Sequence, residues 1–157
     1  MELLDLYERA LPQVYGYLVT RCGDRAVAED LTSETFMAVV GQDVPLTVGW
    51  LIGVARHKLV DHWRRQTREE RLLRAVEGAA DEVDDHSWDV EVDGWHAREV
   101  LSHVAPFHRA ALTLRYLDGL SVPEAAAVLD RTVAATEALL VRARREFRHL
   151  YEGTSDV

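Results

Sequence analysis

Cysteine is nearly absent from this sequence of 157 residues, which contains only Cys22. A single cysteine forms neither an intrachain disulfide nor a multi-cysteine zinc site, so we expect Cys22 to be a small core residue in a reducing compartment. Long hydrophobic runs are also missing, because an apolar stretch such as residues 50–55 is far below the roughly 20 residues of a spanning helix. The N-terminus lacks the pattern of a secretory signal. These absences argue against membrane insertion and predict a cytoplasmic protein.

Basic residues are outnumbered, with 18 Lys and Arg against 27 Asp and Glu, and the formal net charge is −9. That balance alone argues against nucleic acid as a partner. The charge is unevenly distributed, however. Residues 54–74 carry seven basic and three acidic side chains, whereas residues 75–100 carry one basic and nine acidic side chains. Because residues 54–74 are locally basic, the net charge does not exclude nucleic-acid binding as a function.

The acidic segment separates two regions of ordinary globular composition. Its centre, DEVDDHSWDVEVDG at residues 81–94, has too few clustered apolar residues to build a core. We therefore expect two small domains, each near the lower size limit for independent folding. The predicted boundaries are 1–74 for the first domain, 75–96 for an acidic flexible linker, 97–152 for the second domain and 153–157 for a tail.

Apolar residues recur every three or four positions in the ordered stretches, and no stretch alternates strictly as a strand would, so the sequence predicts an all-α protein. The first domain should contain helices at about 3–22, 25–40 and 47–74. Gly23 and Asp24 supply a stop and a cap between the first two, and Thr47 can cap the third. The inner face of the first helix is predicted to hold Leu3, Tyr7, Leu11, Val14, Leu18 and Cys22. That of the second helix holds Ala28, Leu31, Thr35 and Val39, and that of the third holds Leu51, Val54, Ala55, Leu59 and His62.

The second domain should contain four helices, and two of its turns carry clear capping residues. Ser121 and Glu124 match a capping box, and Thr132 can cap the last helix. A compact helix, a three-residue turn and a helix that ends in several arginines are typical of a helix-turn-helix. Any helical hairpin in a bundle has a similar pattern, so DNA binding remains one of two interpretations. The predicted helices are 97–105, 107–118, 122–129 and 133–150.

The third predicted helix carries a stripe opposite its apolar face, made of Arg56, His57, Val60, Asp61 and Arg64. Its arginines could bind phosphates or base edges, and Trp50 or Trp63 could offer an aromatic face to an unstacked base. The stripe could equally be a solvated face with a helical ion pair from Asp61 to Arg64 or Arg65. The residues alone leave both interpretations open.

A metal site of an all-α hydrolase is a further interpretation of the same helix. It would combine His57 and Asp61 with His62, and Glu34 or Asp30 would supply another carboxylate. The helical wheel disfavours this site, because His57 and His62 point about 140° apart. The sequence also lacks a glycine-rich phosphate loop, a nucleophile elbow and an HExxH motif. We expect no catalytic residues, no metal and no cofactor.

Three blocks of the sequence resemble, in order and spacing, the extracytoplasmic-function group of bacterial sigma factors. Residues 24–36, DRAVAEDLTSETF, are similar to the segment that docks on the clamp helices of the RNA polymerase β′ subunit. Residues 50–65, WLIGVARHKLVDHWRR, resemble the helix that melts promoter DNA and reads the minus-ten element. Residues 109–129, RAALTLRYLDGLSVPEAAAVL, resemble the start of the helix-turn-helix that binds the minus-thirty-five element.

The resemblance implies a sigma factor rather than an enzyme. Its partners would be core RNA polymerase, through the β′ clamp helices and the β flap, promoter DNA and an anti-sigma factor. The implied contacts are Asp30, Glu34 and Phe36 for the polymerase, Trp50, Arg56, His57, Asp61, Arg64 and Arg65 for the minus-ten element, and Arg131, Thr132, Ala134, Glu137, Ala138, Arg142 and Arg145 for the minus-thirty-five element. Residues 45–49 take the place of the family's pocket for a flipped base. The acidic linker would either run along the RNA path of the polymerase or be a solvated spacer.

The sequence departs from the family pattern at three positions. His57 stands where asparagine is common, which adds a group that titrates near neutral pH. Asp130 stands where glycine is usual, so we expect the turn to be built differently. Glu137 stands where lysine is frequent and could accept a hydrogen bond from cytosine N4, which predicts an unusual minus-thirty-five preference. A stand-alone helix-turn-helix regulator that does not replace the sigma factor remains the alternative function.

Overall fold

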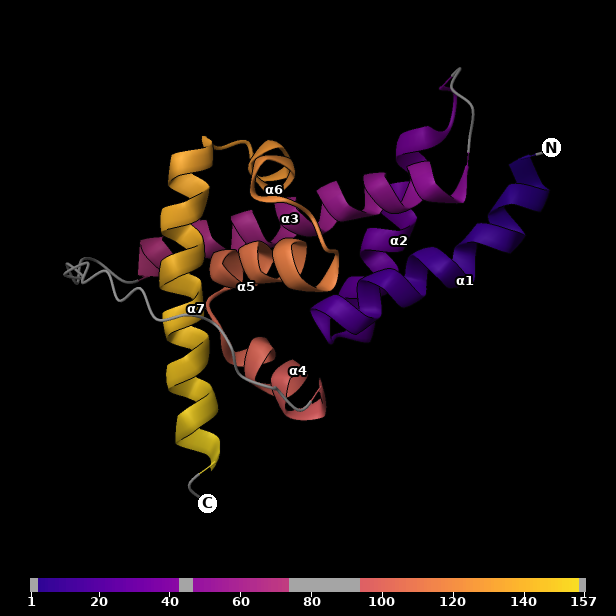
Figure 1. The fold of residues 1–157 in the computed structure, drawn as a ribbon. Coiled ribbons are helices and arrows are strands. Elements are labelled where there is room, and N and C mark those ends of the chain that lie inside the picture. Colours follow the sequence, from indigo (N-terminus) through magenta and orange to yellow (C-terminus); the bar gives the residue numbers. More distant parts are fainter. Residues whose placement is uncertain (1–2, 43–46, 74–93, 156–157) are drawn as a thin grey trace. The chain divides into compact units, whose positions relative to one another are not determined.

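The computed structural model describes residues 3–42, 47–73 and 94–155, and every regular element in them is a helix (Figure 1). The all-α prediction is therefore confirmed. The chain divides into two compact units, residues 1–62 and 63–157. This division falls inside the third helix, earlier than the predicted boundary at residue 74. The predicted linker lies outside the described residues except for its last positions.

The first unit begins with two helices that pack against each other, α1 (Leu3–Cys22) and α2 (Arg25–Val39). Gly23 adopts a φ of 70°, a left-handed conformation that glycine reaches without steric cost, and this ends α1. Asp24 then caps α2, because its carboxylate accepts hydrogen bonds from the main-chain N–H groups of Ala26 at 2.9 Å and Val27 at 3.2 Å. The predicted stop and cap are confirmed.

The buried face of α2 agrees with the sequence prediction, whereas that of α1 is shifted. Ala28, Leu31, Thr35 and Val39 are all buried on α2. On α1 the buried positions are Leu6, Ala10, Val14, Leu18 and Cys22. Tyr7, which was predicted to face inward, is 42% exposed. The four-residue spacing from Leu6 to Cys22 is the stripe that α1 buries, and the aromatic ring of Tyr7 lies beside it.

The third helix, α3 (Val48–Leu73), starts where the sequence predicts, because Thr47 Oγ1 accepts a 3.1 Å hydrogen bond from the Trp50 N–H. Leu51, Ala55 and Leu59 form its buried face, as expected. Val60 is only 1% exposed, so its predicted place on the polar stripe is wrong. Val60 is next to the buried face of α3, and burial of its apolar side chain stabilises the fold more than exposure on the polar stripe would.

The second unit contains α4 (Gly94–His103), α5 (Pro106–Leu112), a π-helical turn η1 (Thr113–Leu117), α6 (Val122–Leu129) and α7 (Val133–Ser155). The long helix α7 contacts α4, α5 and α6 (Figure 1). Sequence reasoning predicted one continuous helix at 107–118 and a last helix ending at 150. The structure instead inserts η1, in which the Asp118 N–H donates to the Thr113 carbonyl, and continues α7 to Ser155.

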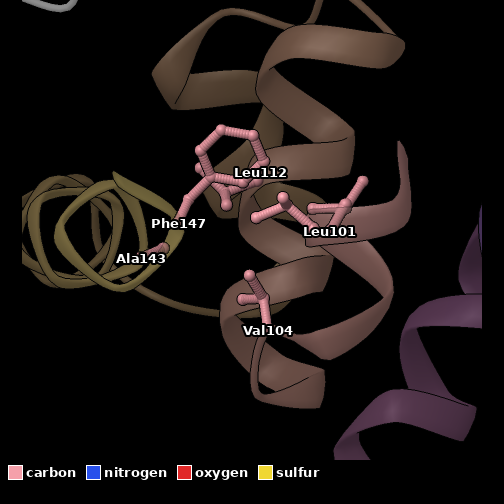
Figure 2. Close-up of a cluster of buried hydrophobic side chains, with 6 residues drawn as sticks. Leu101, Val104, Leu112, Ala143 and Phe147 are labelled. Atoms are coloured by element: carbon pink, nitrogen blue, oxygen red, sulfur yellow. The ribbon is translucent and has the colours of Figure 1, made fainter. Parts of the chain in front are cut away.

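A cluster of six buried residues joins α7 to the helices before it. Phe147, 7% exposed, and Ala143 on α7 pack against Leu112 of α5 and against α4 (Figure 2). The contributions from α4 and the residue after it are Val100, Leu101 and Val104. Burial of one aromatic side chain among these aliphatic groups fixes the position of α7 against α4 and α5.

Candidate functional site

The polymerase-binding residues predicted on α2 lie at its surface. Asp30 and Glu34 are exposed, and Phe36 is half-buried. The Phe36 ring packs edge-on against Tyr7, with 4.8 Å between ring centroids and 64° between ring planes. Both rings line a groove of about 450 Å³ between α1 and α2, whose other lining residues are Leu11, Pro12, Tyr15, Glu29, Thr32 and Ser33. The surface offers an apolar groove with exposed acids nearby.

The predicted minus-ten residues of α3 in the first unit are accessible to different degrees. His57 and Asp61 are exposed, whereas Trp50 and Arg56 are half-buried. Residues 45 and 46 of the predicted base pocket lie outside the described residues. The exposed pair, one turn apart, presents an imidazole and a carboxylate on the surface of the helix.

The remaining residues predicted on α3 for DNA, Trp63, Arg64 and Arg65, belong to the second unit. Arg65 is exposed. Arg64 is half-buried, and its Nη2 donates a 2.6 Å hydrogen bond to the Leu129 carbonyl oxygen. Trp63 is 2% exposed, and the Arg109 guanidinium lies 5.3 Å from its ring centroid. Trp63 is therefore not free to stack on a base, and this part of the sequence interpretation is wrong.

The turn between α6 and α7 has the geometry of a helix-turn-helix. Ser121 and Glu124 form a capping box at the start of α6, as the sequence predicts, and this prediction is confirmed. Asp130 ends α6 with φ 54° and ψ 49°, and its N–H donates to the Ala126 and Ala127 carbonyls. The expectation that this turn is built differently is wrong, since an aspartate adopts here the left-handed conformation typical of glycine. Thr132 caps α7 by accepting from the Ala135 N–H at 3.1 Å.

The residues predicted for the minus-thirty-five element divide into an exposed and a partly buried group. Arg131, Thr132, Ala134, Glu137 and Ala138 are exposed around the N-terminal part of α7. Arg142 and Arg145 are half-buried, and Nη2 of Arg145 is buried without a hydrogen bond. A helix with small exposed side chains around one acidic group can approach a DNA groove closely.

Several polar contacts that support this helix-turn-helix were not predicted. Glu146 on α7 accepts a 2.7 Å hydrogen bond from the Ala105 N–H at the start of α5, and its other oxygen lies 2.5 Å from His108 Nδ1. Arg115 Nη1 donates to the Leu120 carbonyl at 3.2 Å and so holds the loop before α6. No local sequence pattern identifies these partners, because they lie on different helices or in loops.

Neither a metal site nor a membrane segment is found in residues 3–42, 47–73 and 94–155. Within these ranges no group of three or more His, Cys, Asp and Glu side chains could hold an ion. The helices there are also too short or too polar to cross a membrane. The carboxylate–histidine cluster considered from the sequence therefore does not assemble in this part of the chain.

Comparison with known proteins finds two family matches in the chain and several similar proteins. Residues 6–69 match the family described as Sigma-70 region 2, and residues 97–147 match Sigma-70, region 4. The chain is similar to the ECF RNA polymerase sigma factor SigM of Bacillus subtilis, with 30% identity over 99% of both chains. It is 31% identical to the ECF RNA polymerase sigma factor BldN of Streptomyces coelicolor over 92% of this chain, which spans 58% of that protein.

A solved structure shares the fold. It is the sigma factor RpoE of Bartonella quintana in a co-crystal with the anti-sigma factor NepR, matched with a TM-score of 0.54 and 19% identity over 95% of this chain and 96% of that chain. At 19% identity, this match shows that the two chains share a fold.

Proposed function

The chain belongs to the extracytoplasmic-function group of RNA polymerase sigma factors, and we propose that it binds core RNA polymerase and directs it to a restricted set of promoters. The observation that carries this proposal is the presence of two matched regions in one chain, region 2 at residues 6–69 and region 4 at residues 97–147. A stand-alone helix-turn-helix regulator needs only the second. The polymerase performs the chemistry, and the chain acts in the cytoplasm as a recognition subunit rather than as an enzyme.

We assign the polymerase contact to α2. Asp30 and Glu34 place two exposed carboxylates on this helix, and Phe36 supplies an aromatic anchor beside the groove that it shares with Tyr7. Binding surfaces commonly combine an aromatic side chain in a pocket with charged groups that set orientation and association rate. On α2, Phe36 lines the groove together with Glu29, and Asp30 and Glu34 are further exposed acids of the same helix.

Promoter DNA is assigned to two surfaces. His57, Asp61 and Arg65 are exposed on α3 and are proposed to contact the minus-ten element, and the exposed residues at the start of α7 are proposed to contact the minus-thirty-five element. Glu137 is the exposed acid on the second surface, and its carboxylate accepts hydrogen bonds but repels phosphates. We therefore propose that Glu137 reads a cytosine N4 amino group and that the isolated second unit binds DNA weakly.

An anti-sigma factor is proposed as the regulatory partner. Outside the polymerase complex the first unit exposes apolar side chains, including Leu4 at 64%, Met37 at 75% and Val40 at 65%. These exposed apolar side chains are the proposed contacts for a protein partner. The co-crystal of RpoE with NepR is a precedent in a protein of the same fold.

Charge reversal on α2 separates the sigma factor from the stand-alone regulator. Glu34→Arg should weaken binding to core polymerase by tenfold or more, about 1.4 kcal/mol, because an arginine would replace an exposed carboxylate of the proposed surface. Glu70→Arg is the matched control, since Glu70 is an exposed acid on α3, outside the proposed surface. Binding is measured by titrating labelled chain with core polymerase. Equal affinities of the two variants would contradict the assigned polymerase surface.

A further inference from the structure

An exposed methionine lies on α2 in the first unit. Met37 is 75% exposed, which is more than the 64% of Leu4 and the 65% of Val40. The sequence contains one other methionine, Met1. Methionine side chains commonly fill gaps in hydrophobic cores, but the exposure of Met37 leaves its thioether accessible to small solutes.

Met37 shares a face of α2 with the carboxylates that we assign to the polymerase contact. Asp30, Glu34 and Met37 are spaced by four and then three residues, which places their side chains on one face of a helix. All three residues are exposed. The buried face of α2, which includes Ala28 and Thr35, lies on the opposite side. A partner that binds the two carboxylates therefore also covers the thioether.

Apolar side chains accompany Met37 at this end of the first unit. The ring of the preceding residue, Phe36, packs against Tyr7 with 4.8 Å between ring centroids. Leu4 lies one turn before Tyr7 on α1 and is 64% exposed. Val40 follows Met37 by three residues and is 65% exposed. A partner on this surface would bury the Met37 side chain among apolar groups, which is a favourable environment for a thioether.

We infer that Met37 is an oxidation site and that its sulfoxide weakens the binding of core RNA polymerase. This inference rests on the proposed function of the α2 surface. The oxidant is hydrogen peroxide. A lone pair of the sulfur attacks one peroxide oxygen, so that an S–O bond forms and the O–O bond breaks. The second oxygen leaves as hydroxide and takes the proton of the first to give water, and the two electrons that the sulfur loses reduce the peroxide.

Oxidation changes the thioether into a polar S=O group that accepts hydrogen bonds. In the free chain this group faces water, so the stability of the first unit should not change. In the polymerase complex it would be buried, and the neighbouring Asp30 and Glu34 carboxylates cannot donate a hydrogen bond to it. A buried acceptor without a donor is unfavourable, and we expect affinity for the polymerase to fall by about tenfold.

The test compares the full chain before and after treatment with hydrogen peroxide. Mass spectrometry of the tryptic fragment 26–56, in which Met37 is the one methionine, should show the addition of one oxygen atom. Titration with core polymerase should show about tenfold weaker binding of the treated chain, at an unchanged melting temperature. Methionine sulfoxide reductases should then restore the affinity, because they reverse this oxidation and not other oxidative damage.

Two variants separate the Met37 sulfoxide from other effects of peroxide, and each is compared with its own untreated sample. Met37→Leu keeps an apolar side chain that forms no sulfoxide, so peroxide should not change its affinity. Met37→Leu combined with Glu70→Met moves the thioether to an exposed position of α3, outside the polymerase surface. Peroxide should oxidise this second variant as it oxidises the unaltered chain, and should again leave its affinity unchanged.

Three results would overturn the inference. They are an absence of added oxygen on fragment 26–56, an equal affinity of the oxidised and untreated chains, and an equal loss of affinity in Met37→Leu. Each of them leaves the proposed function in place, because the untreated chain still binds core polymerase. If the untreated chain does not bind core polymerase, the proposed function fails and the inference fails with it.

Discussion

Truncation of Phe147 tests the packing that holds α7 in place. Phe147 is 7% exposed and packs with Leu101, Val104 and Leu112 from the preceding helices and their junction (Figure 2). Phe147→Ala removes a buried ring and leaves a cavity, a change that costs about 3–5 kcal/mol in protein cores. A domain of this size has a stability of about 3–9 kcal/mol at 0.05–0.15 kcal/mol per residue. The substitution should therefore remove a third or more of the free energy of unfolding of the helix-turn-helix.

Urea unfolding of the full chain, followed by circular dichroism, measures this loss. With a denaturant slope of about 1–1.5 kcal/mol per molar urea, the midpoint for the second unit should fall by about 2–5 M. Val133→Ala is the control in the same helix, because Val133 is 43% exposed and its truncation should change stability by less than about 0.5 kcal/mol. If Phe147→Ala costs less than about 1 kcal/mol, the cluster does not hold α7 and the reasoning is refuted.

Substitutions at three further positions test local features of the second unit. Ser121→Ala should lower its stability by about 1 kcal/mol in thermal unfolding, because the capping box is lost, and Ser121→Thr should retain most of it. Asp130→Gly should leave the melting temperature unchanged or raise it, whereas Asp130→Val should lower it, because φ is 54° and a β-branched residue is strained there. Glu146→Ala should destabilise more than Glu146→Gln in urea, since an amide oxygen can still accept from the Ala105 N–H.

Prediction from the sequence was most accurate for features that lie within a single helix, such as its caps and its buried face. The cap at Asp24, the capping box at Ser121 and the inner face of α2 depend on residues within four positions of one another, and all three are confirmed. Local spacing was also sufficient to identify the turn before α7, although the prediction that Asp130 changes its geometry was wrong. An aspartate tolerates the left-handed region better than most residues, so it replaces glycine here without a different turn.

Predictions failed where burial depends on a distant helix. Trp63 and Val60 lie at the edge of the apolar arc of α3, and periodicity alone cannot determine whether such positions are covered. The engagement of Arg64 with the Leu129 carbonyl likewise depends on the fold of the second unit. The π-helical turn at residues 113–117 escaped prediction because a segment of five residues is too short for the spacing of its apolar residues to distinguish a π-helix from an α-helix.

Run-off transcription is the most direct test of the central claim. The purified chain is combined with sigma-free core RNA polymerase on fragmented genomic DNA, and the transcript starts are sequenced. The account predicts discrete starts that share two short upstream elements, one near minus ten and one near minus thirty-five. An absence of specific transcripts from a chain that does not bind the core polymerase would contradict it and favour a stand-alone regulator.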